Sequence, residues 1–399
     1  MPPALVDASQ LMVADFPGLA KTTAARTPRG GGLRIGIDAR LMGENLTGIG
    51  HYVTELSREL DQLLPAAQFF LYAPWPVATP VESPRWHARI DPWGAAFERF
   101  RASWATKHAW LLLRAGALCA RDQINVFWAT HAPLIPGLPR GVRLVATVHD
   151  LGHRTVPHAM RRAMVYGHRL LERRLSRADV LLVNSEGTAR KLSELAGYEA
   201  AAVVRPAVSQ HFRRKPDFEV QPVLRSYRIR RPYLLTIASG KPHKNIDMLI
   251  RVFLAMKKDG LLEDYTLVLG GNDGDRLVAK VAQAMGQELT DVTALGYVPD
   301  RDLPSLYGGA EVFVLPSLNE GFGMPVLEAR ACQTKIVATD TPEIREAGGD
   351  RAIYIQANAE GIRRGILAAL EAERPNGPDD LWTWRSSAQV LADAIDPPP

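Results

Sequence analysis

Two glutamates separated by seven residues, Glu320 and Glu328, enclose a loop that contains the sequence Gly321-Phe322-Gly323. An apolar run ends shortly before the loop at Leu315, and a helical pattern opens after it. Backbone N–H groups at such a loop and at the helix start can bind an anion or sugar hydroxyls. Ionised carboxylates only accept hydrogen bonds, so the two glutamates can hold pairs of hydroxyl groups. The alternative is a helix capped by Glu320 with a solvated Glu328.

Lys244 is the second candidate for chemistry, in the segment Ser239-Gly240-Lys241-Pro242-His243-Lys244-Asn245. This segment also follows a strand-like run and precedes a helical pattern, so the lysine charge and the helix dipole would act together on a phosphate. The G-x4-G-K-[ST] spacing of a Walker loop is absent from it. A solvated loop lysine is the alternative interpretation.

Two further candidates occur in the first half of the chain. Thr47-Gly48-Ile49-Gly50-His51 is a glycine-containing turn that opens a helix and lets backbone approach a phosphate, although a simple tight turn fits equally well. His149 follows a strand-like run, and ligands collect beyond the carboxyl ends of strands in open α/β sheets. The alternative is that its ring only satisfies a loop carbonyl. A G-x-S-x-G elbow is absent, so Ser-His-Asp hydrolysis has little support.

Strands and helices in alternation must position these residues, and the sequence predicts both. Short β-branched runs predict buried parallel strands over 33–37, 142–148, 180–183, 233–237, 265–269, 292–295, 312–315 and 335–339. Helical patterns cover 50–64, 161–175, 246–258, 275–285, 324–331 and 382–395. This alternation favours right-handed βαβ units around parallel sheets.

The alternation restarts after residues 205–232, a passage rich in Pro and Arg, which predicts two α/β domains with a ligand cleft between them. A length of 399 residues suits two domains. The predicted parts are a flexible tail over 1–32, an N-terminal domain over 33–215, a C-terminal domain over 216–380, and a helix with a tail over 381–399.

Cysteine content and apolar runs indicate the cellular compartment. Only two cysteines occur, Cys119 and Cys332, so neither a disulfide framework nor a metal cluster is expected. No run of about 18 apolar residues could span a membrane, and the N-terminus lacks the apolar core of a signal peptide. We therefore expect a reduced, intracellular protein.

Charge is divided unevenly between the two halves. Residues 1–230 hold 31 of the 48 Lys and Arg residues and 19 of the 43 Asp and Glu residues, a net charge of about +12, which leaves about −7 on the rest. The stretches Phe97–Arg121 and Arg161–Arg177 combine arginines with aromatic or apolar residues, which suits an anionic membrane surface. An Arg-rich solvated face is the alternative. Nucleic acid is not expected as a partner, because no recognition motif accompanies the charge.

Taken together, the four segments resemble the retaining glycosyltransferases of family 4, over roughly residues 33–355 and in the family's order. The resemblance implies the GT-B architecture, an α/β fold in which two Rossmann-like domains face each other across a cleft. The N-terminal domain would be on the acceptor side, and the C-terminal domain would bind the donor nucleotide.

The resemblance also implies a role for each candidate in the C-terminal domain. Glu320 would hold the hydroxyls of the donor sugar, assisted by the amides of Gly321, Phe322 and Gly323. Glu328 would bind the ribose hydroxyls, and the base would lie near Val298 in the segment Gly296-Tyr297-Val298.

The remaining candidates would act on the reacting sugar and the diphosphate. Lys244 matches the lysine that neutralises the donor diphosphate, and Gly48 and Gly50 match the glycine loop that closes over it. His149 corresponds to the histidine near the reacting sugar and the acceptor.

The sequence also departs from the family pattern. Ser239 stands where many members have Arg, which leaves more of the phosphate charge to Lys244 and His243. Gln333 and Lys335 replace a common Gly and Pro. These departures leave the identity of the donor more open than the class of reaction.

The implied reaction is attack on the same face of the sugar that the phosphate leaves, with the leaving phosphate accepting the proton of the acceptor. Glu320 is not expected to be a covalent nucleophile. No Asp-x-Asp element stands at a suitable strand end, so neither a catalytic metal nor a cofactor beyond the nucleotide sugar is expected.

The opening Gly-Ile-Asp-Ala-Arg and Thr-Gly-Ile-Gly resemble bacterial mannosyltransferases of polysaccharide assembly, which favours GDP-mannose as donor and a lipid-linked saccharide as acceptor. Such an enzyme would be cytoplasmic and peripheral on the inner face of the cell membrane. UDP-glucose, UDP-GlcNAc-type donors and dTDP-rhamnose remain open. An epimerase or phosphorylase on the same fold and a non-catalytic sugar-nucleotide-binding scaffold are the rival functions.

Overall fold

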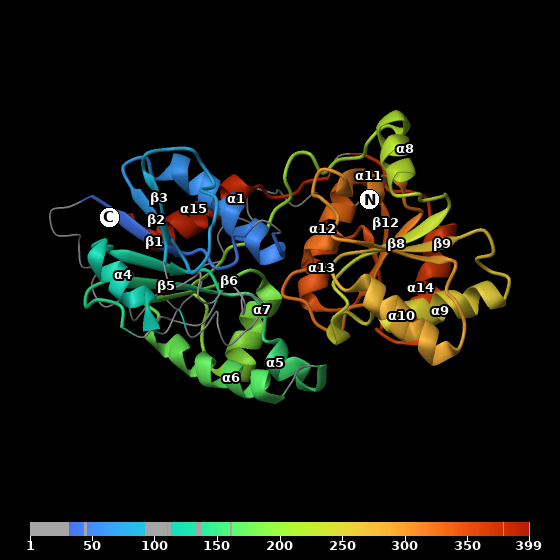
Figure 1. Cartoon of the computed structure of the whole chain (residues 1–399), viewed down its shortest axis with the longest axis horizontal. Coiled ribbons are helices and arrows are strands. Elements are labelled where there is room, and N and C mark those ends of the chain that lie inside the picture. The colour runs from blue at the N-terminus through green and yellow to red at the C-terminus, as the bar shows by residue number, and fades with distance from the viewer. Residues whose placement is uncertain are drawn as a thin grey trace, which may run out of the picture.

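The computed structural model describes residues 32–43, 46–91, 113–131, 137–159, 162–377 and 379–398, together with Trp110. These residues form two α/β domains that lie side by side, each built on one parallel sheet (Figure 1). The predicted pair of Rossmann-like domains is thereby confirmed. The predicted N-terminal tail, residues 97–109 of the basic and aromatic stretch, and Arg161 lie outside the described residues.

The N-terminal domain has a seven-stranded parallel sheet in the order β3-β2-β1-β4-β5-β6-β7. Its strands are β1 (Arg34–Asp38), β2 (Gln68–Ala73), β3 (Trp86–Ile90), β4 (Val126–Ala129), β5 (Arg143–Val148), β6 (Val180–Val183) and β7 (Ala202–Val203). Within the described residues, its helices are α1 (Gly48–Leu63), α4 (Ala115–Arg121), α5 (Gly152–Thr155), α6 (Arg162–Glu172) and α7 (Glu186–Lys191). Short 3-10 or π turns cover Pro157–Ala159, Arg173–Arg177 and Leu192–Ala196.

The C-terminal domain has a six-stranded parallel sheet in the order β10-β9-β8-β11-β12-β13. Its strands are β8 (Tyr233–Ile237), β9 (Thr266–Gly270), β10 (Val292–Gly296), β11 (Val312–Leu315), β12 (Lys335–Thr339) and β13 (Ala352–Ile355). Its helices are α8 (Asp217–Ser226), α9 (Ile246–Lys258), α10 (Gly274–Met285), α11 (Leu303–Gly309), α12 (Met324–Ala331), α13 (Pro342–Gly348) and α14 (Ala359–Glu371). A 3-10 turn covers Pro242–Lys244.

All eight predicted strands are present, each within one residue of its predicted bounds. Helices on both faces bury the central strands, so strands such as β11 are apolar throughout. The prediction did not include β2, β3, β4, β7 and β13. Of these, β3, β7 and β13 lie at sheet edges; polar His87 and Arg89 interrupt the apolar run of β3, and β7 is only two residues long.

The passage 205–232, predicted as an interdomain connection, contains one regular element, helix α8. Pro216 precedes this helix, and Asp217 and Glu219 in its first turn complement the helix dipole. Val220 and Leu224 on α8 are buried in the C-terminal core, so part of the connection belongs to that domain.

The C-terminal helix α15 (Trp384–Ile395) returns to the N-terminal domain and packs on α1. Its buried residues Trp384, Leu391 and Ile395 share one core with Tyr52 of α1. The rings of Tyr52 and Trp384 meet edge to face at 6.1 Å between centroids. Helix α15, predicted as part of a separate helix and tail over 381–399, therefore completes the core of the first domain.

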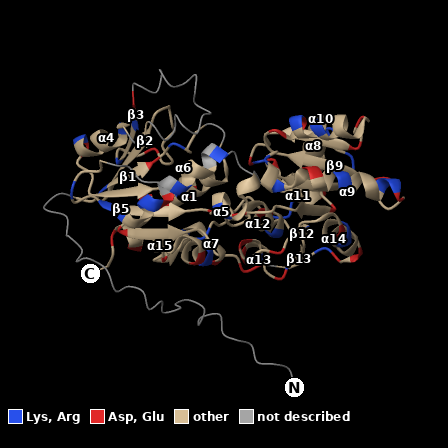
Figure 2. Cartoon of the chain, turned by 90° about the horizontal axis from the view of Figure 1, so that it is seen from below, with Lys and Arg blue, Asp and Glu red and all other residues tan. Residues whose placement is uncertain are grey.

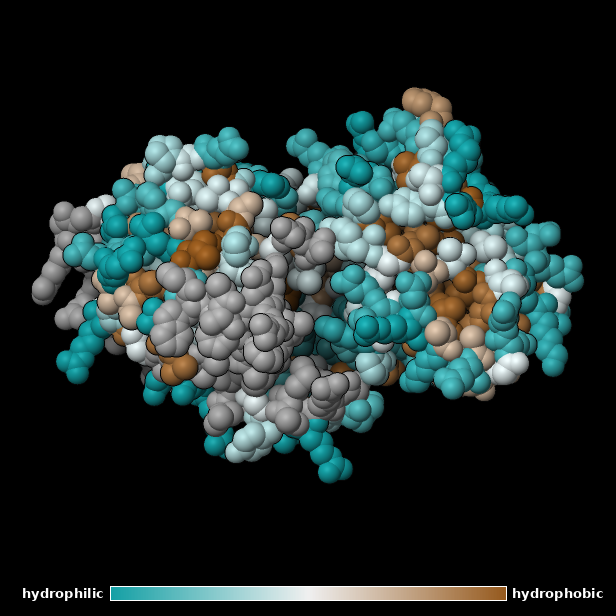
Figure 3. Space-filling view, in the orientation of Figure 1, coloured by the Kyte–Doolittle hydropathy of each residue, from teal (hydrophilic) through white to brown (hydrophobic). Residues whose placement is uncertain are grey.

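Basic and acidic residues both occur along the ribbon of each domain (Figure 2). On the face seen in Figure 3, apolar residues form small patches between hydrophilic ones. Among the described residues, every helix is too short or too polar to cross a membrane.

Candidate active site

Lys244 and Glu320 lie together at the carboxyl ends of two neighbouring strands. β8 and β11 pair in parallel, so the loops that follow them emerge at the same sheet edge. Lys244 Nζ is 2.7 Å from Glu320 Oε1 and 2.8 Å from Oε2. The side chains are 20% and 10% exposed, so the pair is reachable but largely shielded from water. Two residues predicted from separate segments thus form one ion pair.

Glu328 lies on α12, where Tyr307 holds it. The Tyr307 hydroxyl donates to Glu328 Oε2 at 2.7 Å. Burial raises the pKa of Glu328 to about 7, with a smaller contribution from Asp300, although the bond from Tyr307 opposes this shift. The carboxyl group therefore changes charge close to neutral pH.

The loop between the two glutamates contacts the opposite domain. The Gly321 carbonyl accepts hydrogen bonds from Ser185 Oγ at 2.8 Å and from Thr188 Oγ1 at 3.1 Å. A Cβ atom on Gly321 would lie 2.0 Å from the backbone oxygen of His149, so only glycine allows this approach. Gly323 has a φ of +101° and begins α12, a conformation that favours glycine.

The side chain of Phe322 points away from the loop surface into the C-terminal core. It is 3% exposed and meets Trp382 edge to face at 5.8 Å between centroids. Any contribution of Phe322 to ligand binding is therefore limited to its backbone.

His149 follows β5 at the edge of the N-terminal sheet that faces the loop. Its Nε2 lies 2.7 Å from the Thr130 carbonyl oxygen, so Nε2 carries the proton. The ring packs edge to face on Tyr52 at 5.1 Å and stacks near His131 at 6.1 Å. Burial lowers the pKa of His149, so the imidazole is neutral at pH 7. The His149 ring therefore does satisfy a backbone carbonyl, that of Thr130, as the alternative interpretation predicted.

The glycines of the first motif lie at the start of α1. Thr47 caps this helix by accepting from the Gly50 amide at 3.4 Å. A Cβ atom on Gly50 would lie 2.5 Å from the Leu41 oxygen, whereas one on Gly48 would meet nothing within 4 Å. Gly50 therefore shapes the turn, and the exposed Gly48 leaves space for a ligand.

The remaining predicted donor residues follow β8 and β10. Ser239 is half-buried, and the His243 carbonyl accepts from the Leu318 amide at 2.8 Å, which ties the two loops together. Burial, reinforced by Lys244, lowers the pKa of His243. Val298 is 7% exposed and belongs to the core, while its neighbour Tyr297 is 42% exposed. The accessible ring near the predicted base position is therefore Tyr297.

Three residues of the site were not predicted. Ser185 and Thr188 reach the Gly321 carbonyl from the start of α7, and Asn319 Oδ1 accepts from Thr155 of the opposite domain at 2.8 Å. The segment Ser185-Glu186-Gly187-Thr188 has the form of a helix N-cap, which could have located the helix. Its contact with Gly321 depends on how the domains pack.

Ion pairs between the domains surround this contact. Lys191 Nζ lies 2.7 Å from Glu343 Oε1, and the Glu343 side chain is fully buried. Arg205 Nε lies 2.6 Å from Glu346 Oε1, and the Glu186 amide donates to Glu346 Oε2 at 2.8 Å. Helix α7 is thereby held on α13 beside the Gly321 loop.

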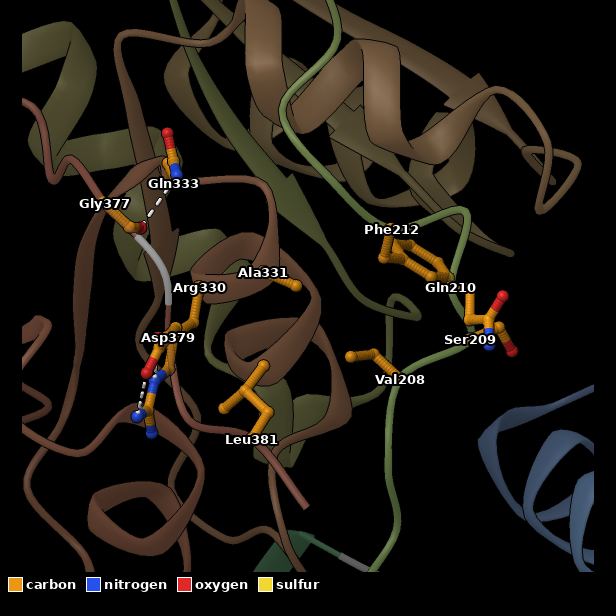
Figure 4. A pocket seen from close by; sticks show the side chains of 10 residues that line it. All are labelled: Val208, Ser209, Gln210, Phe212, Arg330, Ala331, Gln333, Gly377, Asp379 and Leu381. Carbon is orange, nitrogen blue, oxygen red and sulfur yellow. Dashed lines mark hydrogen bonds and ion pairs between the residues drawn. The ribbon is translucent and has the colours of Figure 1, made fainter. Parts of the chain in front are cut away.

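A cavity of about 250 Å³ lies away from this site, between α12 and the chain that connects the domains (Figure 4). Arg330 pairs with Asp379 at 2.6 Å, and Gln333 donates to the Gly377 carbonyl at 3.0 Å. The charged side chains among its described lining residues thus neutralise each other, which makes it a poor candidate for chemistry. Over the described ranges, no group of three or more His, Cys, Asp and Glu residues could hold a metal ion.

Two Rossmann-like domains, with a lysine–carboxylate pair at the strand ends of one and a glycine loop that contacts the other, are the features of the GT-B class of glycosyltransferases. Residues 46–211 match the model described as Glycosyltransferase Family 4, and residues 225–380 match the one described as Glycosyl transferases group 1. The chain is 30% identical over 364 residues to O-antigen chain mannosyltransferase B of Escherichia coli, covering 88% of this chain and 92% of that protein. The chain therefore belongs to glycosyltransferase family 4.

Solved structures agree on the fold. Sucrose-phosphate synthase from Thermosynechococcus elongatus superposes with a TM-score of 0.64 at 16% identity, covering 91% of this chain and 94% of that one. WaaG, a glycosyltransferase involved in lipopolysaccharide biosynthesis, has a TM-score of 0.64 at 14% identity, with coverages of 92% and 96%. Both likenesses support the GT-B architecture.

Proposed function

We propose that the protein is a retaining mannosyltransferase that moves mannose from GDP-mannose to a lipid-linked saccharide in cell-surface polysaccharide assembly. The observation that carries the transferase chemistry is the Lys244–Glu320 pair at the paired ends of β8 and β11. The choice of mannose rests on the 30% identity to an O-antigen chain mannosyltransferase. The chemistry rests on a structural observation and the donor on sequence similarity, so the identity of the donor needs its own test.

The two charges of the ion pair would bind different parts of the donor sugar nucleotide. The diphosphate would take the Lys244 ammonium, which leaves Glu320 to accept hydrogen bonds from the hydroxyls of the sugar. As the sugar–phosphate bond breaks, negative charge grows on the diphosphate and positive charge on the sugar. A preorganised donor aimed at such charge contributes about 3–4 kcal/mol to lowering the barrier.

The acceptor would attack from the face that the phosphate leaves, so the new bond keeps the configuration of the donor. The leaving phosphate accepts the proton of the acceptor hydroxyl. His149 is neutral and donates through Nε2 to Thr130, so it would position the reacting sugar rather than supply charge. Lys244 and the backbone amides of Gly48 and Gly321–Gly323 would stabilise the diphosphate without a metal ion.

A thermal-shift panel of GDP-mannose, UDP-glucose, UDP-GlcNAc and dTDP-rhamnose tests the donor, because a ligand raises stability by mass action. The expected result is stabilisation by GDP-mannose above the other three, followed by mannose transfer in a turnover assay. Stabilisation by another sugar nucleotide would reassign the donor. Stabilisation without turnover on any acceptor would favour the non-catalytic scaffold.

The proposed location is the cytoplasmic face of the cell membrane, supported by the surface of α6 and the turn after it. Arg162, Arg169, Arg173 and Arg177 are exposed there, and the Tyr166 side chain is 73% exposed. Arginines beside an exposed aromatic ring suit an anionic bilayer. Flotation with neutral and anionic liposomes tests this location, and equal partitioning with both would contradict it.

A further inference from the structure

A second polar pocket, of about 320 Å³, lies in the C-terminal domain at the amino ends of β8 and β11. The Lys244–Glu320 pair lies at the opposite sheet edge, about 15 Å away for strands of this length. The charged residues that line the pocket are Arg214, Lys215, Arg231, Arg374, Asp217 and Glu311. Two of these cations, Arg231 and Arg374, belong to residues 231–399, which carry a net negative charge.

Arg374 has the most fixed guanidinium of this group. It donates to the Gly308 carbonyl at 3.1 Å and also to the Ala310 carbonyl. Carbonyl oxygens orient the guanidinium but leave its charge uncompensated. Burial lowers the pKa of Arg374, and Arg214 and Arg231 lower it further, although Glu311 offsets part of the shift. The native fold therefore holds three guanidinium groups close enough to repel one another.

Two of the four cations already have a carboxylate partner, Arg231 in Asp217 and Lys215 in Glu219, whereas Glu311 pairs with a lysine outside the lining. Glu311 Oε1 lies 2.9 Å from Lys335 Nζ, and Asp217 Oδ1 lies 2.6 Å from Arg231 with its side chain 65% exposed. Arg214 has no hydrogen-bond or ion-pair partner among the residues that the structure describes. Arg214 and Arg374 are therefore the two lining cations without a carboxylate partner among the described residues, and they leave positive charge in excess in the pocket.

Glycine at position 309 allows this arrangement. A Cβ atom there would lie 2.7 Å from the Tyr233 hydroxyl oxygen and 3.2 Å from Arg231 Nη2. A larger residue would push the Arg231 guanidinium away from the backbone. The pocket thus depends on close approach of a cation to the end of α11.

We propose that this pocket binds a phosphate-bearing anion. Guanidinium groups bind phosphate oxygens through paired hydrogen bonds, and three of them here converge from separate segments. The volume is at the lower end for small-molecule pockets, which suits inorganic phosphate, pyrophosphate or a small phosphate ester. The described lining contains no aromatic ring on which a nucleobase could stack, which distinguishes the pocket from the donor site.

Titration calorimetry with sodium pyrophosphate tests the proposal on the full chain. The K244A background removes the main cation of the donor cleft, so that binding at the second pocket is measured separately. Pyrophosphate is expected to bind K244A, and adding R214A and R231A should weaken that binding at least about tenfold, as expected for lost charge-assisted hydrogen bonds. The R213A substitution is the matched control, because Arg213 is an exposed neighbour that does not line the pocket.

Arg214 and Arg231 are both exposed, so their substitution should leave the fold intact, which the thermal midpoint without ligand checks. Two outcomes overturn the proposal. One is the absence of pyrophosphate binding to K244A, and the other is equal binding by the R214A/R231A and R213A variants in that background.

A vesicle-binding experiment distinguishes a free phosphate from the phosphate of a lipid headgroup, because both present the same chemical group to the pocket. Vesicles of phosphatidylcholine with phosphatidic acid are compared with phosphatidylcholine alone, again between the R214A/R231A and R213A variants. If both pyrophosphate and vesicle binding fall, the pocket binds a lipid phosphate. If only pyrophosphate binding falls, it binds a soluble phosphate, and both results support the pocket.

Discussion

Lys244 Nζ lies within 2.8 Å of both carboxylate oxygens of Glu320, so the residue expected to bind phosphate is paired with the residue expected to bind sugar. Each charge compensates the other in this pair. A sugar nucleotide carries the complementary groups, anionic phosphates and hydroxyl donors, and can take over both partners. The pair therefore keeps two partly buried charges satisfied, and in the proposed reaction it would place them on either side of the bond that breaks.

Replacing Lys244 by Ala is expected to lower kcat about 100-fold or more, as for removal of one preorganised donor. The substitution also leaves Glu320 without its cation, so donor binding should weaken as well. Steady-state kinetics with the donor identified by the thermal-shift panel measure both effects. Lys241→Ala is the matched control, because Lys241 is exposed in the same loop. Turnover by K244A close to that of K241A would exclude Lys244 from the reacting phosphate.

Glu328 should make donor binding depend on pH. Its pKa is raised to about 7, so the carboxylate form, which we propose accepts hydrogen bonds from two ribose hydroxyls, is lost as the pH falls through that value. We expect kcat/KM for the donor to fall below about pH 7, measured over about pH 5.5 to 8.5. In Glu328→Gln this dependence should disappear. Persistence of the same acid limb in E328Q would assign it to another group.

The raised pKa of Glu328 also predicts a change in stability, with a definite sign. Between about pH 4.5, the ordinary pKa of glutamate, and about pH 7, Glu328 is protonated in the folded state but ionised in the unfolded chain. The free energy of unfolding should therefore fall as pH rises through this window. Glu328→Gln lacks the titration, so its stability relative to the wild type should increase with pH across the window. Thermal midpoints at matched pH values measure this difference.

The loops that carry the site could be predicted from the sequence. Ligands of open α/β sheets bind beyond the carboxyl ends of the strands, and these ends can be located from local residue patterns. Lys244 and Glu320 are 76 residues apart, yet both follow interior strands of one parallel sheet, so their meeting could be expected. The contact from Ser185 to Gly321 and the return of α15 to α1 could not be foreseen. Both depend on how one domain packs against the other, for which a single sequence carries no periodic signal.

The sequence also did not predict which side chains of the binding segments point into the core. Phe322 lies between two glycines of a binding loop, but its ring is buried against Trp382, because the apolar core behind the loop offers it more contact than the cleft. Val298 is buried in the same way, while Tyr297 is exposed beside it. A motif identifies the backbone segment at a site, whereas the neighbouring packing decides which side chains face the ligand.

Gly321→Ala should disrupt the contact between the domains while each domain stays folded. The added Cβ would lie 2.0 Å from the His149 oxygen, which forces the loop away from the N-terminal domain. We expect kcat to fall about 10–100-fold, because small misplacement of reacting groups is costly, with unchanged circular dichroism. Gly274→Ala is the control, since a Cβ there meets Ala294 at an ordinary 3.4 Å. Equal activity of the two variants would mean that the loop does not need this approach.

The buried carboxylate of Glu343 predicts that the domains separate when its partner is lost. Lys191 lies 2.7 Å from it across the domain boundary, and the Glu343 side chain has no exposed surface. Lys191→Met would leave a buried charge unpaired, at a cost of about 3–5 kcal/mol if the interface stayed closed. Opening the interface hydrates Glu343 and avoids most of this cost, so the open arrangement should dominate.

Small-angle X-ray scattering should therefore report a larger radius of gyration for K191M, together with reduced kcat. Adding Glu343→Gln removes the unpaired charge and should return both quantities toward the wild-type values. Arg363→Met is the control, because Arg363 pairs with Asp259 on the surface of the C-terminal domain alone. If K191M and R363M have the same dimensions and turnover, the Lys191–Glu343 pair does not hold the domains together. A restored double variant would instead identify the charge itself, rather than the shape of the lysine side chain, as the determinant of closure.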